Sequence, residues 1–231
     1  MDNFIFHNPT RLIFGKGMIA QLSQQIPADK RIMITFGSGS VKTNGVYEQV
    51  SQALEGRDYT EFWGIESNPD ISTLKKAIES GKEKNIDFLL AVGGGSVIDG
   101  TKLISAGIPY DGDAWELVKK GSAQNTIPLG TVLTIPATGS EMNNGAVISC
   151  RETHEKYPFF SSHPVFSILD PTVTFSLPDY QIACGLADTF VHVMEQYMTK
   201  TNESYLMDRW SESILRTLVQ IAPQIKENKQ D

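Results

Sequence analysis

FLLAVGGGSVIDG, at positions 88–100, joins a wholly apolar run to a cluster of glycines. Residues 88–92 are apolar at every position, which is typical of a strand buried on both faces of a parallel sheet. Residues 93–96 (GGGS) come next, followed by a helical pattern over 97–106. Glycines let the backbone take positive φ and approach a ligand, and the free N–H groups at a helix start favour an anion. The stretch therefore predicts a strand, a phosphate-binding turn and a helix.

Strand and helix patterns alternate on both sides of this stretch. Strands are predicted at 31–36, 59–65, 129–135 and 165–169, and helices at 18–26, about 46–54 and 71–84. The turn Asn68-Pro69-Asp70 marks the start of the last of these helices. Strands that alternate with helices at this spacing indicate βαβ units. We therefore predict a Rossmann-like α/β domain with a doubly wound, mostly parallel sheet.

The pattern changes in two places further along the chain. Residues 137–163 are predicted to be irregular, and a loop of that length inside a compact domain is usually functional or disordered. After Pro178 the strand signals stop, and helices are predicted from about Asp179 to Thr199 and from about Glu203 to Ile225. We place a domain boundary there, with an α/β domain over 1–178 and the start of a helical domain over 179–231.

Composition and charge exclude several classes of protein. The 231 residues, 40% of them hydrophobic, suffice for one large α/β domain or for that domain and part of another. A net charge of −7 would repel nucleic-acid phosphates. The first residues lack the pattern of a signal peptide, and no apolar run approaches the ~20 residues of a membrane span. The two cysteines suit a reducing compartment. We expect a cytoplasmic protein that binds neither nucleic acid nor membrane.

The glycine-rich turn departs from the two common phosphate-loop patterns. The dinucleotide fingerprint needs glycine or alanine where Ile98 stands, and the ATP-binding loop needs lysine where Thr101 stands. A plain tight turn stays possible, although three glycines destabilise a loop unless their flexibility is used. A second turn, Gly37-Ser38-Gly39-Ser40, also follows a strand, so the two turns can share one cofactor.

The residues around this second turn favour NADP over NAD. Neither Gly37 nor its neighbours supply the acidic residue that binds a ribose 2′-hydroxyl, whereas two serines and Lys42 can accommodate a 2′-phosphate.

Asp188 and His192 stand four residues apart in a predicted helix, so both project from one face. A carboxylate and an imidazole one turn apart can ligate a divalent metal. At this spacing such a pair is more often a surface hydrogen bond, so the residues alone favour the structural interpretation. Cys184 lies one turn earlier, but a thiolate is a soft donor, and we expect it to be a buried structural cysteine.

With these motifs assembled, the chain resembles the iron-containing (group III) alcohol dehydrogenases, most closely their NADPH-dependent aldehyde reductase and butanol dehydrogenase branch. The resemblance rests on FHNPTRLIFGKG (6–17), GSGSVKTNGVYEQV (37–50), AVGGGSVIDGTK (91–102), LTIPATGSE (133–141), AVIS (146–149), LDPTVTFSLP (169–178) and DTFVHVMEQY (188–197). It implies hydride transfer between NADP(H) and a small alcohol or aldehyde, with a divalent metal, Fe²⁺ or Zn²⁺, as Lewis acid. A homodimer of the full-length protein is also expected.

The resemblance also implies roles for individual residues. Lys156 matches a lysine near the nicotinamide and metal, and Asp188 and His192 match two of four metal ligands, which raises the metal interpretation above the structural one. The residues matched to the cofactor are Gly37, Ser38, Gly39, Ser40, Asn68, Gly94, Gly95, Ser96, Asp99, Thr138 and Ser140.

One departure from the family leaves other interpretations open. Family members continue beyond residue 231, and the two remaining ligands are histidines in that part, so the chain is expected to be truncated at its C-terminus. A fragment that binds NADP(H) without turnover is therefore one alternative. A zinc-dependent polyol dehydrogenase of the glycerol type, from the same superfamily, is another, but the missing acidic residue near Gly37 argues against it.

Overall fold

The computed structural model of the chain describes residues 3, 5–199 and 204–228. They form two compact units, residues 1–171 and 172–231. The division falls after Pro171, whereas the sequence placed the domain boundary after Pro178; the roles assigned to the two domains stay predictions.

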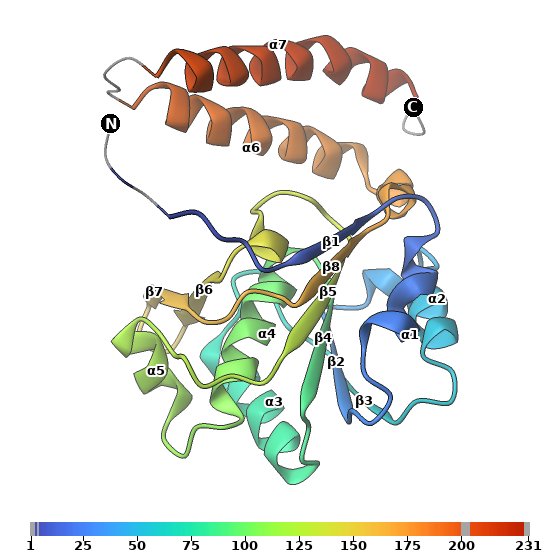
Figure 1. Cartoon of the computed structure of the whole chain (residues 1–231), viewed down its shortest axis with the longest axis vertical. Helices are drawn as coiled ribbons and strands as arrows, with labels where there is room; N and C mark the ends of the chain where they lie inside the picture. The colour runs from blue at the N-terminus through green and yellow to red at the C-terminus, as the bar shows by residue number, and fades with distance from the viewer. Residues whose placement is uncertain (1–2, 4, 200–203, 229–231) are drawn as a thin grey trace. The chain divides into compact units, whose positions relative to one another are not determined.

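A six-stranded parallel sheet forms the centre of the first unit (Figure 1). Its strands follow the spatial order β1 (Arg11–Phe14), β8 (Phe166–Leu169), β5 (Leu129–Leu133), β4 (Phe88–Gly93), β2 (Ile32–Phe36) and β3 (Tyr59–Phe62). Every residue of β2, β4 and β5 is buried, because helices cover both faces of a parallel sheet. The predicted Rossmann-like fold is confirmed.

Helices lie on both faces of this sheet (Figure 1). One face carries α3 (Ile71–Glu83), α4 (Gly95–Gly107) and α5 (Ala114–Lys120), and the other carries η1 (Met18–Gln21), α1 (Leu22–Gln25) and α2 (Val46–Ala53). The Asp70 side chain accepts a hydrogen bond from Ser72 N, so α3 begins with a side-chain cap where the turn predicted it. The sequence pattern missed α5.

The prediction of an irregular stretch over 137–163 is wrong. This stretch contains the short η3 (Ser140–Met142) and an antiparallel hairpin of β6 (Gly145–Cys150) and β7 (Glu155–Phe160). Ala146, Ile148 and Cys150 alternate along β6 and are buried in the core cluster that contains α4 residues. Pro158 and the charges of β7 hide the pattern, because a proline cannot donate to a strand ladder and is rare in strands.

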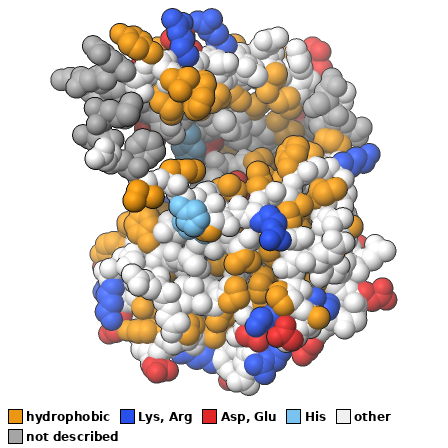
Figure 2. All heavy atoms as spheres, viewed as in Figure 1, with side chains coloured by type: hydrophobic (Ala, Val, Ile, Leu, Met, Phe, Trp, Pro, Cys, Tyr) orange, Lys and Arg blue, Asp and Glu red, His pale blue; other side chains and the backbone are white. Residues whose placement is uncertain are grey.

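The second unit contains all of η4 (Pro171–Ser176) but its first residue, and the two predicted helices, α6 (Asp179–Tyr197) and α7 (Tyr205–Glu227). Glu203, where the second helix was predicted to begin, lies outside the described residues. Hydrophobic side chains, among them Val191, Trp210 and Val219, are exposed on this pair of helices (Figure 2). In the described part of the chain, no helix combines the length and apolar character needed to cross a membrane.

Candidate functional site

The order of the strands creates a crevice between β2 and β4. From β2 the chain moves outward to β3, returns past β2 to β4, and continues to β5 on the opposite side. The loops after β2 and β4 therefore leave neighbouring strands in opposite directions. Open α/β sheets bind ligands at such a switch point, beyond the carboxyl ends of the strands.

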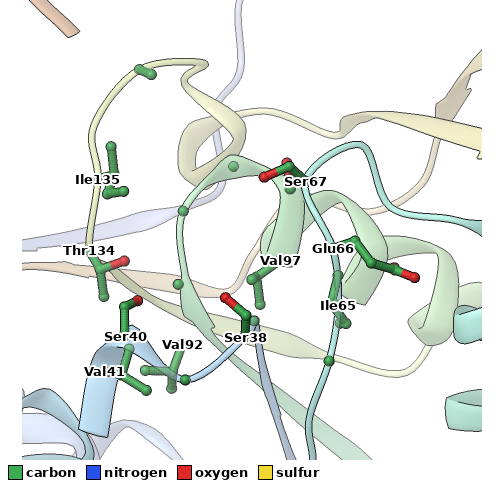
Figure 3. A pocket seen from close by; sticks show the side chains of 18 of the residues that line it. Ser38, Ser40, Val41, Ile65, Glu66, Ser67, Val92, Val97, Thr134 and Ile135 are labelled. Atoms are coloured by element: carbon green, nitrogen blue, oxygen red, sulfur yellow. The ribbon is translucent and has the colours of Figure 1, made fainter. Parts of the chain in front are cut away.

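A cavity of about 550 Å³ occupies this crevice, a volume within the range of small-molecule and cofactor sites. Four segments at or just past the ends of strands contribute residues to its lining: 37–41, 64–67, 92–97 and 134–138, the last without Pro136. Figure 3 shows Ser38 and Ser40 after β2, Val97 at the start of α4, and Thr134 and Ile135 after β5. Both small-residue turns thus open on one cavity.

The glycines after β4 have a different role from the one expected. Gly93, Gly94 and Gly95 do not adopt positive φ. A Cβ at Gly93 would lie 2.6 Å from Val97 Cγ2, and one at Gly95 would lie 2.4 Å from Thr138 Oγ1. Glycine is needed here because the turn packs closely on α4 and on the segment after β5. Gly94 is the N-cap of α4 and has no side-chain cap, and the first N–H groups of a helix have no partner within it.

The turn after β2 does use positive φ, at Gly39, where φ is 114°. This turn places Ser38 and Ser40 on the wall of the cavity (Figure 3). Lys42, in the same loop, is directed elsewhere: its Nζ lies 4.0 Å from the centroid of the Trp63 ring. That ring stacks on Phe36 with a centroid separation of 4.0 Å. The lysine is therefore held by an aromatic cluster beside the turn.

Sequence reasoning missed Glu66, an acidic residue that lines the cavity. It follows β3 and is far in the sequence from Gly37, whose neighbours include no acidic residue. Because β3 is the sheet neighbour of β2, the turn after β3 ends at the same edge of the sheet as the turn after β2, and an acidic residue there can reach the same cavity. Glu66 Oε1 accepts a hydrogen bond of 2.7 Å from Thr73 Oγ1, and its side chain points away from Ser38 and Ser40 (Figure 3).

Three residues matched to the cofactor, Asn68, Asp99 and Ser140, are not among the residues that line the cavity. The Asp99 carboxylate accepts hydrogen bonds from Ser140 Oγ at 2.8 Å and from Val147 N at 2.9 Å. Ser140 Oγ lies 2.8 Å from Thr138 Oγ1, so Asp99 is joined to the wall through two hydroxyls. Burial raises the pKa of Asp99, and the hydrogen bonds to its carboxylate offset this only partly.

Lys156 is brought next to this wall by the hairpin. Its Nζ donates a hydrogen bond of 2.7 Å to Asn68 Oδ1, and Asn68 N donates one of 3.4 Å to Ser96 Oγ. Ser96 lines the cavity. Three residues that are far apart in the sequence are therefore connected at the edge of the cofactor-sized space.

A model of the iron-containing alcohol dehydrogenase family matches residues 9–171. The chain belongs to the iron-containing alcohol dehydrogenases. It is 51% identical over 229 residues to the NADPH-dependent aldehyde reductase YqhD of Escherichia coli, covering 96% of this chain and 59% of that protein. It is 47% identical over 234 residues to a probable NADH-dependent butanol dehydrogenase of Bacillus subtilis, covering 99% of this chain and 60% of that protein.

Solved structures of iron-containing alcohol dehydrogenases share the fold. The substrate- and cofactor-free form of the E. coli reductase matches with a TM-score of 0.91 at 47% identity, over 100% of this chain and 60% of that one. The NADH-dependent butanol dehydrogenase A of Thermotoga maritima also matches with a TM-score of 0.91, at 37% identity, over 98% of this chain and 58% of that one. The chain thus spans about 60% of the length of these relatives.

The residues matched to the metal ligands of iron-containing alcohol dehydrogenases lie in the second unit. His192 Nε2 is 4.0 Å from Asp188 Oδ1 on α6, and both side chains are about half exposed. Among the described residues, no group of three or more histidine, cysteine, aspartate or glutamate side chains has the geometry of a metal site. The expectation for Cys184 is wrong, since it is exposed, like most of α6. That Asp188 and His192 ligate a metal stays a prediction.

Proposed function

We propose that the chain binds NADP(H) in the cavity between β2 and β4. The observation that carries this proposal is that two glycine- and serine-rich turns, from neighbouring parallel strands, line one space at the switch point of the sheet. The first turn of α4 supplies N–H groups for an anion such as the pyrophosphate. Hydroxyls of Ser38, Ser40 and Ser96 add further donors, and Thr138 closes the opposite wall.

The preference for NADP over NAD rests on the turn after β2. Two hydroxyls face the cavity there, while the carboxylate of Glu66 is directed away from them and bonded to Thr73 (Figure 3). A carboxylate placed beside those hydroxyls would repel a 2′-phosphate. The relatives are named for both cofactors, as the E. coli reductase is NADPH-dependent and the B. subtilis protein NADH-dependent.

Fluorescence titration with NADPH and NADH tests the site and its preference together. We expect tighter binding of NADPH, and a Ser40→Asp variant that reduces the difference by weakening NADPH binding. Equal affinity of the unaltered chain for both cofactors would contradict the preference, and binding of neither would overturn the proposed site.

The activity that we propose for the whole protein is that of a metal-dependent alcohol dehydrogenase or aldehyde reductase acting on a small alcohol or aldehyde. When bound, NADP(H) would supply or accept the hydride, and a divalent metal, Fe²⁺ or Zn²⁺, would act as a Lewis acid on the carbonyl oxygen. Asp188 and His192 fit such an ion as hard and borderline donors, and they would provide two of its ligands. Lys156 and Asn68 hold polar groups at the edge of the cavity, where a carbonyl substrate can be oriented. A homodimer stays a prediction.

A second candidate is a module that binds NADP(H) without turnover. It is favoured by the metal donors, because only two of them come together in the described part of the chain. Metal analysis combined with an aldehyde-reduction assay separates the two functions. A stoichiometric metal with turnover would support the enzyme, whereas bound NADPH with neither metal nor turnover would support the module.

A further inference from the structure

The outer edge of β6 is hydrogen-bonded at every second residue, although no strand in the described part of the chain pairs with it and only an isolated bridge joins Ser149 to Asp70. Gly145 O accepts a hydrogen bond of 2.6 Å from Lys102 Nζ, and Val147 N donates one of 2.9 Å to Asp99. Further along, Ser149 N donates to Pro69 O at 2.9 Å and Arg151 N donates to Asp70 at 2.8 Å. An unpaired strand edge leaves a row of N–H and C=O groups without partners. Here α4 and the turn before α3 take the place of a neighbouring strand.

Lys102 is the unusual member of this set, because its side chain is fully buried. Its Nζ also donates 2.9 Å to Asn143 Oδ1, and the same oxygen accepts from Gly145 N at 2.9 Å. Asp99 and Glu141 are the acidic groups that face it. Burying a lysine is unfavourable unless it is paired and hydrogen-bonded, and this one does not line the cavity. Both acceptors of its side-chain hydrogen bonds, Asn143 and Gly145, lie at the start of the hairpin.

The hairpin carries Lys156 on its second strand, opposite Ser149. The hydrogen bond from Lys156 to Asn68, and that from Asn68 to Ser96, require the hairpin to lie at a set distance from α4. A shift of β6 on α4 would move Lys156 away from the cavity edge. The same shift would disturb Ser140 and Thr138, which share the Asp99 network.

We propose that Lys102 is a positioning residue that holds the β6–β7 hairpin, and Lys156 with it, against α4 at the edge of the cavity. Its ammonium group bridges Asn143 and Gly145, which precede and begin β6. This role rests on the proposed cofactor site for its functional consequence. The anchoring of the hairpin by Lys102 does not depend on a bound ligand.

Amide hydrogen exchange of the chain without ligand tests the anchoring. Lys102→Met retains the length of the side chain but removes the donors. We expect faster exchange over 145–160 than in the unaltered chain, with the central strands unchanged. Lys76→Met, at an exposed position on α3, is the matched control and should exchange as the unaltered chain does. Unchanged hairpin exchange in Lys102→Met, or an equal increase throughout the sheet, would overturn the proposal.

Asn143→Ala gives a second route if Lys102→Met fails to fold. It removes one of the two acceptors of the ammonium group, so the same segment should exchange faster, though by less. An unchanged hairpin in that variant would also contradict the role of Lys102.

A double-mutant cycle on NADPH affinity tests the link to Lys156. We expect Lys102→Met to weaken NADPH binding about tenfold, and to have little further effect when Lys156→Met is already present. If the effects of the two substitutions on NADPH affinity multiplied in the double variant, they would be independent, and the link between Lys102 and Lys156 would be contradicted. If the unaltered chain bound no NADPH, the proposed cofactor site would fail, while the exchange measurement would still decide whether Lys102 anchors the hairpin.

Discussion

Asp99 and Lys102 are buried ionisable residues on one face of α4, and burial moves their pKa values in opposite directions. Burial lowers the pKa of Lys102 to about 8, although the charges of Asp99 and Glu141 oppose the change. Burial also raises the pKa of Asp99. His163 is affected as well, since burial and the nearby charge of Lys102 lower its pKa. Burial thus disfavours the charged forms of both residues.

The depressed pKa of Lys102 predicts a pH dependence of stability. Between about pH 8 and pH 10.5 the unfolded chain keeps a proton on Lys102 that the folded chain has released, so stability rises with pH in this window. Between these two pH values the free energy of unfolding of the unaltered chain should rise by about 3 kcal/mol relative to that of Lys102→Met. Denaturant unfolding of both proteins at several pH values measures the difference. A difference that does not vary with pH would contradict the prediction.

Gly95 and Gly94 offer a matched pair of substitutions. A Cβ at Gly95 would lie 2.4 Å from Thr138 Oγ1, whereas one at Gly94 would lie no closer than 3.6 Å to Ile135 Cβ. Gly95→Ala should therefore lower the free energy of unfolding by about 1–3 kcal/mol through overpacking. Gly94→Ala should cost less than about 1 kcal/mol, since alanine is only a weaker N-cap than glycine. Equal stability of the two variants would contradict the interpretation that close packing on Thr138 requires a glycine at Gly95.

At the scale of elements, α3 and the hairpin are joined by one carboxylate. Asp70 caps α3 through Ser72 and accepts a hydrogen bond from Arg151 N just after β6. Burial alone would raise the pKa of Asp70, but the hydrogen bonds from Ser72 and Arg151 outweigh it and the pKa lies below its ordinary value. The ionised carboxylate therefore stabilises the folded chain.

Asp70→Asn should destabilise the chain near neutral pH by about 1–2 kcal/mol, since the amide presents an N–H group where the carboxylate accepts hydrogen bonds. The contribution of Asp70 is present above its unfolded pKa of 3.8 and is lost as the pH falls through the lower folded value. The difference in stability between the unaltered chain and Asp70→Asn should thus become smaller at acid pH. Thermal unfolding from neutral to acid pH measures it, and a constant gap would count against the capping role.

For the whole molecule, the two units have separable roles in the proposed function. All residues that line the cavity belong to the first unit, and the Asp188–His192 pair belongs to the second. A chelator should therefore leave the affinity for NADPH unchanged, and His192→Ala should do the same while reducing binding of Zn²⁺ or Fe²⁺. NADPH titration with and without EDTA, beside a metal-binding assay, is the measurement. Loss of NADPH binding on chelation would show that the two sites depend on each other.

The amino-acid sequence by itself determined five of the six strands of the sheet, all but β1, and it placed the two small-residue turns just after two of them. The run over 88–92 is apolar throughout, and that over 129–133 is interrupted only by Gly130 and Thr131, because both faces of the central strands are covered, so short-range pattern sufficed to find them. The turn containing Ser38 and Ser40 and the turn before α4 carry local signals, and they do meet at the cavity.

Only the tertiary structure decided what lies around those turns. Glu66 lines the cavity because β3 is placed beside β2, and β6 pairs with β7 on one edge while α4 and the turn before α3 bond its other edge. The need for glycine at Gly95 comes from Thr138, and Lys102 finds its acceptors beyond residue 142. These features depend on contacts between residues far apart in the chain, and such contacts leave no periodic pattern in the sequence.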